Sequence, residues 1–305
     1  MSYVVCVPSY KRSKLCNDKT LSTLRRLNIP RERVNVFVAN KEEYDEYERD
    51  LDKGLYNRIV LGVKGLVKQR EFIEEMYKGG QNIIFFDDDV SDIDLSMSVR
   101  FRGKSLDSFF KGAFEECLKN KSYIWGVYPV YNPFFRKDRP ELSVGLKFIV
   151  GCFYGIINRP KLKDIKLTIT RENDQKEDSE RTLRYYEHDG ITIRFDKIGL
   201  KTVFYGKEGG LGRFEERLKP QEIATKLLLE KYPDYGILMV RKSGVHEFKF
   251  KRLGPKNQKN TEKRTRNKRN TRGARNKRNT RGARSTRNTR GARSTRRTST
   301  EAVPR

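Results

Sequence analysis

The sequence predicts an α/β protein with a Rossmann-like, mostly parallel sheet, and three observations support this prediction. Short apolar runs rich in branched and aromatic residues recur through residues 1–90, as is typical of strands buried on both faces. Stretches of helical length separate them, and such alternation predicts parallel strands with right-handed crossovers. The last of these runs leads directly into three consecutive acids, Asp87, Asp88 and Asp89.

The first half of the chain alternates strands and helices with short connections. The strands expected here are residues 4–7, 34–39, 58–61 and 83–86. Asn17 or Asp18 can cap the first helix, whose apolar face carries leucines at helical spacing. A polar helix is expected over 41–53 and a further helix over about 66–77.

The second half is expected to continue the α/β pattern with less regular spacing. Its expected elements are a helix at 106–118, a strand at 123–128, an apolar run at 147–157, a helix after Asp178, strands at 191–195 and 202–205, a flexible glycine-rich loop at 206–212, a helix at 223–229 and a hairpin of 235–240 with 247–250. Asp178 or Ser179 fits the N-cap of its helix, which is the structural alternative to a chemical role for Asp178.

The three acids are the main candidate for a functional site. They follow the end of a buried strand, and open α/β sheets bind ligands beyond the carboxyl ends of their strands. Like charges this close repel, and their pKa values rise unless a cation holds them together. A divalent metal with phosphate ligands is the usual cation for such a cluster. The alternative interpretation is an acidic turn exposed to solvent.

Phosphate-binding glycine loops are missing from this sequence. No G-x-G-x-x-G follows the first strand, and no G-x-x-x-x-G-K-[ST] occurs anywhere. A phosphorylated ligand would therefore be held by a metal and by cationic side chains such as Arg12, Lys64 and Arg70, unless these are ordinary surface charges. The turn Pro8-Ser9-Tyr10-Lys11-Arg12 offers a hydroxyl, an aromatic ring and two cations at a strand end, which suits a base and a diphosphate.

An aromatic loop with proline, residues 128–140, carries Arg136 and Lys137. Such a mixture of stacking faces and cations suits a polymer acceptor such as nucleic acid. A lid that packs on the body of the protein is an equally good interpretation of the same residues.

Histidines and cysteines give weaker signals. Of the two histidines, His188 adjoins an acid and is a further candidate metal ligand, although a lone histidine is more often structural. The four cysteines show no metal-binding spacing and read as reduced thiols, which predicts an intracellular protein. No apolar stretch approaches the roughly 20 residues that span a bilayer, so we expect a soluble protein with no membrane partner.

The C-terminal residues differ sharply in composition from the rest. Residues 256–305 carry a net charge of +17, which leaves +10 of the total +27 for residues 1–255. Arg-Asn-Thr-Arg-Gly-Ala-Arg recurs three times with a nine-residue period, centred on Arg272, Arg281 and Arg290. We therefore expect a folded domain over 1–252 and a disordered tail over 253–305, because the tail lacks apolar residues. Its arginines suit a nucleic-acid backbone; a solubilising or localisation segment is the alternative.

An ordered set of motifs resembles the TET-associated glycosyltransferases of phages and large DNA viruses, within the GT-A superfamily. The motifs are Val7 to Arg12, Phe37-Val38-Ala39-Asn40 with Glu42-Glu43-Tyr44, Gly62 to Val67 with Gln69-Arg70, Asp87-Asp88-Asp89-Val90, Glu177-Asp178, His188-Asp189-Gly190 and Gly209-Gly210-Leu211-Gly212. The resemblance extends to about residue 250 and leaves out the tail.

The resemblance implies a GT-A fold and an inverting hexosyltransferase that depends on Mn²⁺ or Mg²⁺. The implied donor is a nucleotide-sugar, favoured to be a UDP-sugar, and the implied acceptor is a hydroxymethylated pyrimidine in DNA, in a virus or phage-infected cell. Metal ligands would be Asp87 and Asp89 of the DxD motif, and Asp178 the catalytic base with Glu177 as second choice. The implied donor-binding residues are Pro8, Ser9, Tyr10, Arg12, Asn40, Lys64, Gly65, Arg70 and Asp88, the last on the ribose or sharing the metal.

Two positions depart from this family pattern. Asn40 stands where an acid is expected to read the donor base, and Lys176 stands where a glycine is expected before Glu177-Asp178. Two other enzyme classes share the same core features: a glycosyltransferase acting on a protein or glycan, and a nucleotidyltransferase. A DNA-binding protein without catalysis would explain the tail but leave the acids unexplained. Oligomeric state is not indicated by any of these features.

Overall fold

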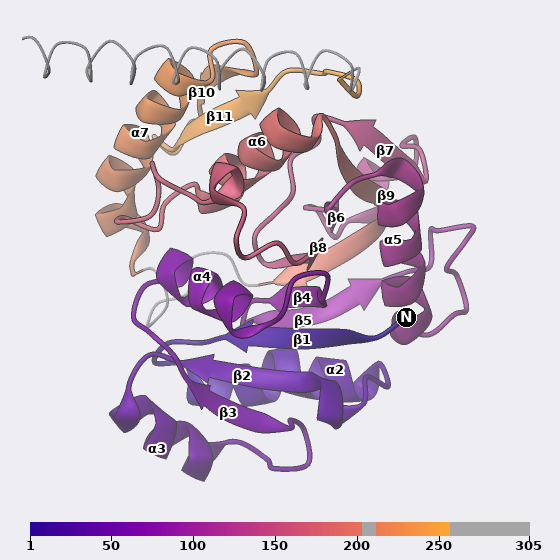
Figure 1. Cartoon of the computed structure of the whole chain (residues 1–305), viewed down its shortest axis with the longest axis vertical. Helices are drawn as coiled ribbons and strands as arrows, with labels where there is room; N and C mark the ends of the chain where they lie inside the picture. The colour runs from indigo at the N-terminus through magenta and orange to yellow at the C-terminus, as the bar shows by residue number, and fades with distance from the viewer. Residues whose placement is uncertain (203–211, 257–305) are drawn as a thin grey trace, which may run out of the picture. The chain divides into compact units, whose positions relative to one another are not determined.

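The computed structural model describes residues 1–202 and 212–256 as a sheet with helices on both faces (Figure 1). The predicted strand residues 203–205, most of the loop 206–212 and nearly all of the tail, with Arg272, Arg281 and Arg290, lie outside the described residues. The nine strands of the sheet are β1 (Tyr3–Pro8), β2 (Val34–Val38), β3 (Arg58–Leu61), β4 (Asn82–Phe86), β5 (Val90–Asp94), β6 (Ile124–Tyr128), β7 (Leu142–Gly145), β8 (Phe153–Ile157) and β9 (Thr192–Thr202).

The order of strands is β3-β2-β1-β4-β8-β6-β9-β5, and β7 pairs with β9. The first four strands are all parallel, as the alternation of strands and helices predicts. β8 lies antiparallel between β4 and β6, so β6 runs in the same direction as β4. The predicted α/β fold class is thus confirmed, with a parallel first half and antiparallel pairings added in the second.

The main helices connect the strands. They are α1 (Ser13–Cys16), the π-helical turn η1 (Asn17–Leu21) and α2 (Ser22–Arg26), which run on from one another, then α3 (Lys41–Asp50), α4 (Leu66–Met76), α5 (Leu106–Asn120), α6 (Glu177–Asp189) and α7 (Phe214–Lys231). Short 3₁₀ turns lie at Arg31–Arg33, Pro133–Phe135 and Lys163–Ile165. A separate hairpin, β10 (Gly236–Val240) with β11 (His246–Phe250), packs on α7.

Strand β9 differs from the sequence prediction. The sequence suggested a strand at 191–195 with 202–205 as its partner, whereas Thr192–Thr202 forms one long strand. A break in register lets it change neighbours: its first part pairs with β6 and β7, and its last part pairs with β5. The polar residues 196–197 therefore mark this irregularity, and they do not form a turn.

Two apolar cores lie on opposite faces of the sheet, because neighbouring residues of each central strand point to opposite faces. Val5 and Val7 of β1 pack with α1, η1, α2 and α5, whereas Val4 and Cys6 pack with α4 and α6. Burial on both faces explains why these strands read as unbroken apolar runs.

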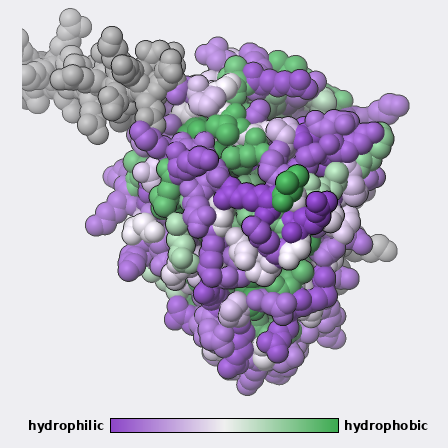
Figure 2. Space-filling view, turned by 90° about the vertical axis from the view of Figure 1, so that its right-hand side faces the viewer, coloured by the Kyte–Doolittle hydropathy of each residue, from purple (hydrophilic) through white to green (hydrophobic). Residues whose placement is uncertain are grey.

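On the face shown in Figure 2 the surface is largely hydrophilic, with apolar side chains in smaller groups between the hydrophilic ones. All four cysteines are buried and unpaired, in agreement with the expectation of reduced thiols. Among the residues described, none of the helices is both long and apolar enough to cross a bilayer.

Candidate donor and metal site

The three acids lie at the edge of the sheet where the parallel strands end. β1 and β4 are neighbours in register, with Cys6 opposite Phe85, so Pro8 reaches the level of Asp87. The turn after β1 therefore meets the turn after β4. This edge is where an open α/β sheet binds its ligand.

Asp88 is bound from the β1 turn. Ser9 donates from Oγ to its Oδ2 at 2.6 Å, and Arg12 Nη1 donates to its Oδ1 at 3.3 Å. Tyr47 of α3 lies with its hydroxyl 2.7 Å from Ser9 Oγ. Burial raises the pKa of Asp88 to about 6, although Arg12 and Ser9 oppose the shift. The structure thus brings together Ser9, Arg12 and Asp88, three of the predicted donor residues.

Asp89 lies beside β9, and its carboxyl, like that of Asp88, has a raised pKa. Thr202 donates a hydrogen bond to Asp89 Oδ1, and Arg12 Nη1 lies 3.7 Å from its Oδ2. Burial and the neighbouring Asp87 carboxylate raise the pKa of Asp89 to about 7. A bound cation would favour the charged form of this carboxyl, as sequence reasoning anticipates for clustered acids.

Asp87 is held by Arg70, which is buried. Arg70 Nη2 donates to Asp87 Oδ1 at 2.7 Å and to the carbonyl oxygen of Gly151 at 2.9 Å. Its other terminal nitrogen binds Glu177. Arg70 thus connects Asp87 with Gly151 and Glu177. Because protein acceptors occupy both terminal nitrogens, Arg70 is less available to bind a diphosphate than the sequence suggests.

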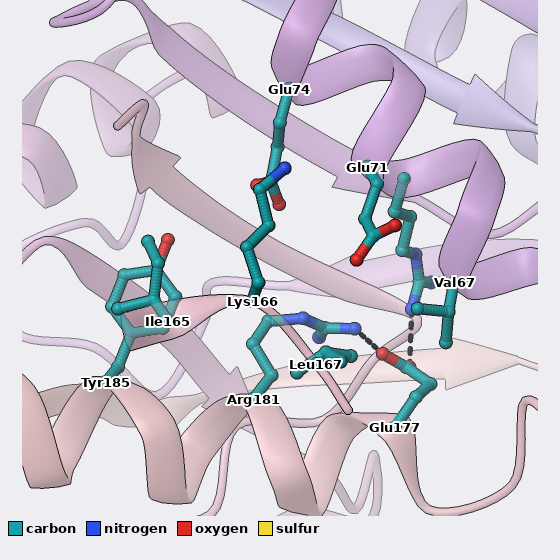
Figure 3. A pocket seen from close by; sticks show the side chains of 10 residues that line it. Val67, Glu71, Glu74, Ile165, Lys166, Leu167, Glu177, Arg181 and Tyr185 are labelled. Carbon is teal, nitrogen blue, oxygen red and sulfur yellow. Dashed lines mark hydrogen bonds and ion pairs between the residues drawn. The ribbon is translucent and has the colours of Figure 1, made fainter. Parts of the chain in front are cut away.

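Glu177 is buried between two arginines at the start of α6. Its Oε1 pairs with Arg70 and its Oε2 with Arg181. Figure 3 shows Arg181 and Glu177 pointing toward one another, with Glu71 and Glu74 projecting from α4 across a small pocket. Since each carboxylate oxygen of Glu177 faces a guanidinium, Glu177 is poorly suited to accept a proton, and the second choice of base does not match the geometry.

Tyr154 of β8 completes this buried group of charges. The Arg181 guanidinium lies 4.1 Å from the centre of its ring and the Arg70 guanidinium lies 5.5 Å from it. Cations over an aromatic face are attracted by the ring quadrupole. No local pattern in the sequence indicated Arg181 or Tyr154, because their positions depend on contacts between distant segments.

Asp178 faces Gly151, the residue whose carbonyl binds Arg70. A Cβ atom added to Gly151 would lie 3.3 Å from Asp178 Cβ and closer still to Glu177 Oε1, so only glycine fits there without a shift. Asp178 Oδ1 accepts a hydrogen bond from its neighbour Ser179 N at 2.8 Å. Burial raises the pKa of Asp178, although Lys176 opposes the shift. The first-choice base is thus connected to Asp87 through Gly151 and Arg70.

The N-cap of α6 is Lys176, so neither Asp178 nor Ser179 has the capping role that the sequence allowed. Lys176 has φ +60° and ψ +24°, the left-handed conformation that favours glycine. The family pattern expects a glycine at this position. Lys176 therefore has a backbone conformation that glycine would adopt with less strain.

Asn40 has a structural role that its sequence position did not reveal. It is the N-cap of α3 and accepts a hydrogen bond from Glu43 N at 3.0 Å. Glu43 is itself buried and accepts from the backbone of Lys11 and Ala39. Glu42, the neighbouring acid of the same motif, is exposed.

Tyr10, Lys64 and Gly65 form the outer part of the same edge. Lys64 Nζ lies 5.8 Å from the centre of the Tyr10 ring, and Lys64 is exposed. Gly65 has φ +101° directly before α4, which is a conformation that side chains rarely adopt. These two turns, which come from distant segments, therefore meet above the strand ends as the sequence predicts.

The structure does not bring His188 to the acids. It lies 11 residues after Glu177 on α6, about 16 Å along the helix at 1.5 Å per residue. Its nearest carboxylates are Asp164, at 3.7 Å, and Asp189, at 3.8 Å. His188 is therefore wrong as a candidate metal ligand, because its sequence position beside an acid said nothing about its place on the helix.

The predicted contact of Arg136 with an acceptor is also wrong, because its side chain is fully buried. It binds Asp94, the carbonyl oxygen of Lys197 at 2.7 Å and the carbonyl oxygen of Tyr131 at 2.6 Å. A guanidinium held in this way cannot contact an acceptor and instead anchors its loop. Lys137, the other predicted contact, is exposed.

The turn of acids is also fixed by a residue that the sequence did not indicate. Thr20 Oγ1 donates to the carbonyl oxygen of Asp87 at 2.6 Å and accepts from Val90 N at 3.0 Å. One hydroxyl from the helical segment η1 thus bridges the two ends of the acidic turn. Contacts of this kind hold the carboxylates in place before any ligand binds.

Within 1–202 and 212–256, no group of three or more His, Cys, Asp or Glu side chains is arranged to hold a metal by itself. The acids at the strand ends still suit Mg²⁺ or Mn²⁺, because both ions prefer oxygen ligands and Mg²⁺ usually takes one or two carboxylates together with phosphate oxygens and water. Asp87, with a side chain 33% exposed, is the most accessible of the three.

Several solved structures are similar to this chain, each at low identity. They include TarS 1-349 from S. aureus (15% identity, TM-score 0.45), the mannosyltransferase PcManGT from Pyrobaculum calidifontis in complex with GDP-Man and Mn²⁺ (13%, 0.44), and glucosyl-3-phosphoglycerate synthase from Mycobacterium tuberculosis in complex with Mn²⁺, uridine-diphosphate and glucosyl-3-phosphoglycerate (11%, 0.42).

These alignments cover 75%, 76% and 83% of this chain, and 66%, 64% and 90% of the other chains. The chain thus spans less than two thirds of the first two. No protein-family model matches the sequence, and no curated protein matches it.

Proposed function

We propose that this chain is a metal-dependent, inverting GT-A glycosyltransferase related to the TET-associated family. It would move a sugar from a nucleotide-sugar, with a UDP-sugar as the first candidate, to a hydroxymethylated pyrimidine in DNA. One observation carries the proposal: three acids at the carboxyl end of β4 are held by Ser9 and Arg12 after β1 and by Arg70 of α4. Such a group needs a cation and lies where α/β sheets bind nucleotides.

On the donor side, Asp87 and Asp89 are the proposed metal ligands. A bound Mn²⁺ or Mg²⁺ would neutralise the charge of the departing nucleoside diphosphate. Asp88 is 5% exposed and already bound by Ser9 and Arg12, so we assign it to holding the turn and not to the ribose. Tyr10 and Lys64, at the outer part of the edge, are the proposed contacts for the base and diphosphate.

On the acceptor side, Asp178 is the proposed general base. Its Oδ1 accepts from Ser179 N, which leaves Oδ2 to take the proton of the acceptor hydroxyl. The acceptor oxygen then forms a bond to the anomeric carbon while the bond from that carbon to the phosphate oxygen breaks, and the electron pair leaves with the nucleoside diphosphate. A raised pKa suits a base that works near neutral pH, where such groups contribute ~10²–10⁴ in rate.

DNA is the proposed acceptor because of the resemblance and the charge. The chain carries +27 in total, of which +10 falls within residues 1–255. Basic proteins of this kind bind the phosphate backbone with a strong dependence on salt. The resemblance adds the hydroxymethylated pyrimidine and a virus or phage-infected cell as the setting.

The decisive experiment separates the enzyme classes by product. The full chain with Mn²⁺ is first screened by thermal shift against UDP-, GDP- and dTDP-sugars and against nucleoside triphosphates. It is then incubated with hydroxymethylated DNA, or with a protein or glycan acceptor, and the products are analysed by mass spectrometry. A hexose added to the hydroxymethyl group is expected. Release of pyrophosphate from a nucleoside triphosphate, or transfer to a protein or glycan but not to DNA, would contradict the proposal.

The contribution of the tail is tested by truncation. Residues 1–256 are compared with the full chain for DNA affinity across a salt series. The full chain is expected to bind more tightly and with a steeper salt dependence, because each neutralised phosphate adds about 0.9 to the slope. Equal affinity and equal slope would show that the tail does not contact DNA.

A further inference from the structure

Two adjacent phenylalanines project from the loop after β6. Phe134 is 65% exposed and Phe135 is 53% exposed, and their rings lie edge to face with centres 5.5 Å apart. Large aromatic side chains dominate the energetics of cores and interfaces, so two exposed neighbours need an explanation. Neither ring contributes to the apolar cores that pack on the sheet.

The loop that carries them is held rigidly from within. The buried Arg136 guanidinium binds Asp94 and two backbone carbonyls, and Gly199 packs against it so closely that a Cβ there would lie 2.6 Å from Arg136 Cζ. Lys197 Nζ also donates to the carbonyl oxygens of Arg136 and Lys137. The loop is thus pinned from β5 and β9, and its exposed rings are displayed by a fixed support.

The same loop starts at the edge of the sheet that carries the acids. Gly126 of β6 and Phe85 of β4 both pair with Tyr154 of β8, so Tyr128 and Asp87 reach the same level. Two strand spacings separate them, which is about 10 Å. Tyr131 further donates from its hydroxyl to Asp92 Oδ2 at 2.6 Å, which ties the loop to the strand that follows the acids.

Cations accompany the rings on this loop. Lys137 Nζ lies 4.7 Å from the centre of the Phe134 ring, and Arg139, which is exposed, lies 4.2 Å from the Tyr128 ring. Asp138, between these two cations in sequence, is exposed as well, so the loop retains a net positive charge. Aromatic faces next to cations are the combination that binds unpaired bases together with their phosphates.

We propose that Phe134 and Phe135 form a stacking platform for unpaired bases of the DNA strand, with Lys137 on the adjacent phosphate. This inference rests on the proposed DNA acceptor and assigns it a surface. A hydroxymethyl group on a base inside a duplex must leave the helix to reach a site formed by Asp178 and the acids, because enzymes that modify bases generally need the base outside the stack. The platform would hold the neighbouring unstacked bases.

Binding is measured with the full chain and no sugar donor. The probes are a labelled oligothymidylate, whose bases are free to stack, and a duplex of the same length, each across a salt series. Heparin and phosphatidylserine vesicles are the comparison polyanions without bases. The variants are Phe134→Ala, Phe135→Ala, Phe134→Leu and Lys137→Ala. Leu118→Ala is the matched control, because Leu118 is 59% exposed on α5, outside this loop.

Each alanine variant of the two rings is expected to weaken binding of the oligothymidylate roughly 5- to 150-fold, the range for loss of one stacked base. The salt slope should stay unchanged, since stacking releases no counterions, and Phe134→Leu should lose nearly as much as Phe134→Ala. Lys137→Ala should instead reduce the slope by about 0.7, the value per phosphate on a single strand. Binding of the duplex should change little in the ring variants.

Three results would overturn the platform. They are unchanged oligothymidylate affinity in both ring variants, an equal loss of binding to heparin, which has no bases, and loss of binding to phosphatidylserine vesicles without loss on DNA. The last would identify a lipid surface as the partner. Because no donor is present, failure here is distinct from failure of sugar transfer, which the product analysis above measures.

Discussion

Two adjacent carboxylates at the start of α6 should respond in opposite ways to loss of charge. Glu177 lies between Arg70 and Arg181, with both oxygens engaged. Among residues 1–202 and 212–256, no cation forms a hydrogen bond with Asp178, and burial disfavours the charged form of its carboxyl. The substitutions Glu177→Gln and Asp178→Asn remove the same charge at neighbouring positions and keep nearly the same shape, so each serves as the control for the other.

The expected cost of Glu177→Gln follows from burial. Removing one partner of a buried ion pair costs about 3–5 kcal/mol, because the remaining charges are left unpaired away from water. Here Arg181 loses its ion-pair partner, whereas Arg70 keeps its pair with Asp87, so we expect a cost within that range. In a domain of this size such a loss lowers the melting temperature by roughly 10 °C or more. Asp178→Asn should change the free energy of unfolding by less than about 1 kcal/mol, because the amide needs no counter-charge.

The effects on turnover should follow the opposite order, with the larger loss in Asp178→Asn. Asp178→Asn is expected to lower kcat by ~10²–10⁴ while leaving donor affinity unchanged, since it removes only proton transfer. Glu177→Gln should mainly raise the KM for metal and donor, because Arg70 would no longer hold Asp87 from a fixed position.

The assay combines urea unfolding of both variants with steady-state transfer and thermal-shift titration of the donor. Full stability with abolished turnover in Glu177→Gln, together with an active Asp178→Asn, would refute this reasoning and exchange the two roles. Loss of stability in both variants would instead show that Asp178 has a charged partner in the folded protein.

Three further substitutions test the site and its surroundings. Asp89→Ala should abolish transfer that depends on Mn²⁺ without loss of folding, as measured by activity and circular dichroism; undiminished transfer would rule out the proposed metal ligand. Burial raises the pKa of Glu74 from 4.5 to about 7, so the folded state holds this proton more tightly than the unfolded state, and stability falls as pH rises from 4.5 to 7. The free energy of unfolding of Glu74→Gln should therefore exceed that of the parent above pH 7, by up to about 3 kcal/mol, and should equal it below pH 4.5. Urea unfolding at pH 4 and pH 8 measures both values, and a difference that is the same at the two pH values would contradict this. Lys176→Gly should be more stable than Lys176→Ala by about 1 kcal/mol in the same assay, because φ is positive there and both variants lose the contact with Glu247; equal stabilities would show that no strain is stored.

The sequence was most informative where a signal is local. Strands β1, β2 and β4 were predicted because each is an apolar run buried on both faces, and the acids were found because they stand directly at the end of such a run. Strand β3, which lies at the edge of the sheet and is partly exposed, was predicted from its place in the alternation of elements. The turn from Pro8 to Arg12 was assigned to the same edge by the rule that parallel strands end together. Each of these inferences needed only neighbouring residues and the alternation of elements.

Long-range contacts could not be predicted in the same way. Arg70 and Glu177 are 107 residues apart. In the sequence, an arginine that binds buried acids cannot be distinguished from an arginine that binds a phosphate ligand. Arg136 was misassigned for that reason, since composition alone does not distinguish a buried guanidinium from an exposed one. The long strand β9 was divided in two because its irregular register places polar residues where a turn would have them.

The buried charges set the relative positions of acids that come from distant segments. Arg70 binds Asp87 and the carbonyl of Gly151, and Gly151 has no side chain, so that Asp178 and Glu177 can pack directly against its backbone. The position of the candidate base relative to the candidate metal ligands is therefore set by one guanidinium and one glycine. A larger residue at Gly151 would separate the two groups without altering either, and Gly151→Ala should consequently lose turnover while metal-dependent donor binding persists. If donor binding and turnover fell together, the acids and Asp178 would not be separate parts of the site.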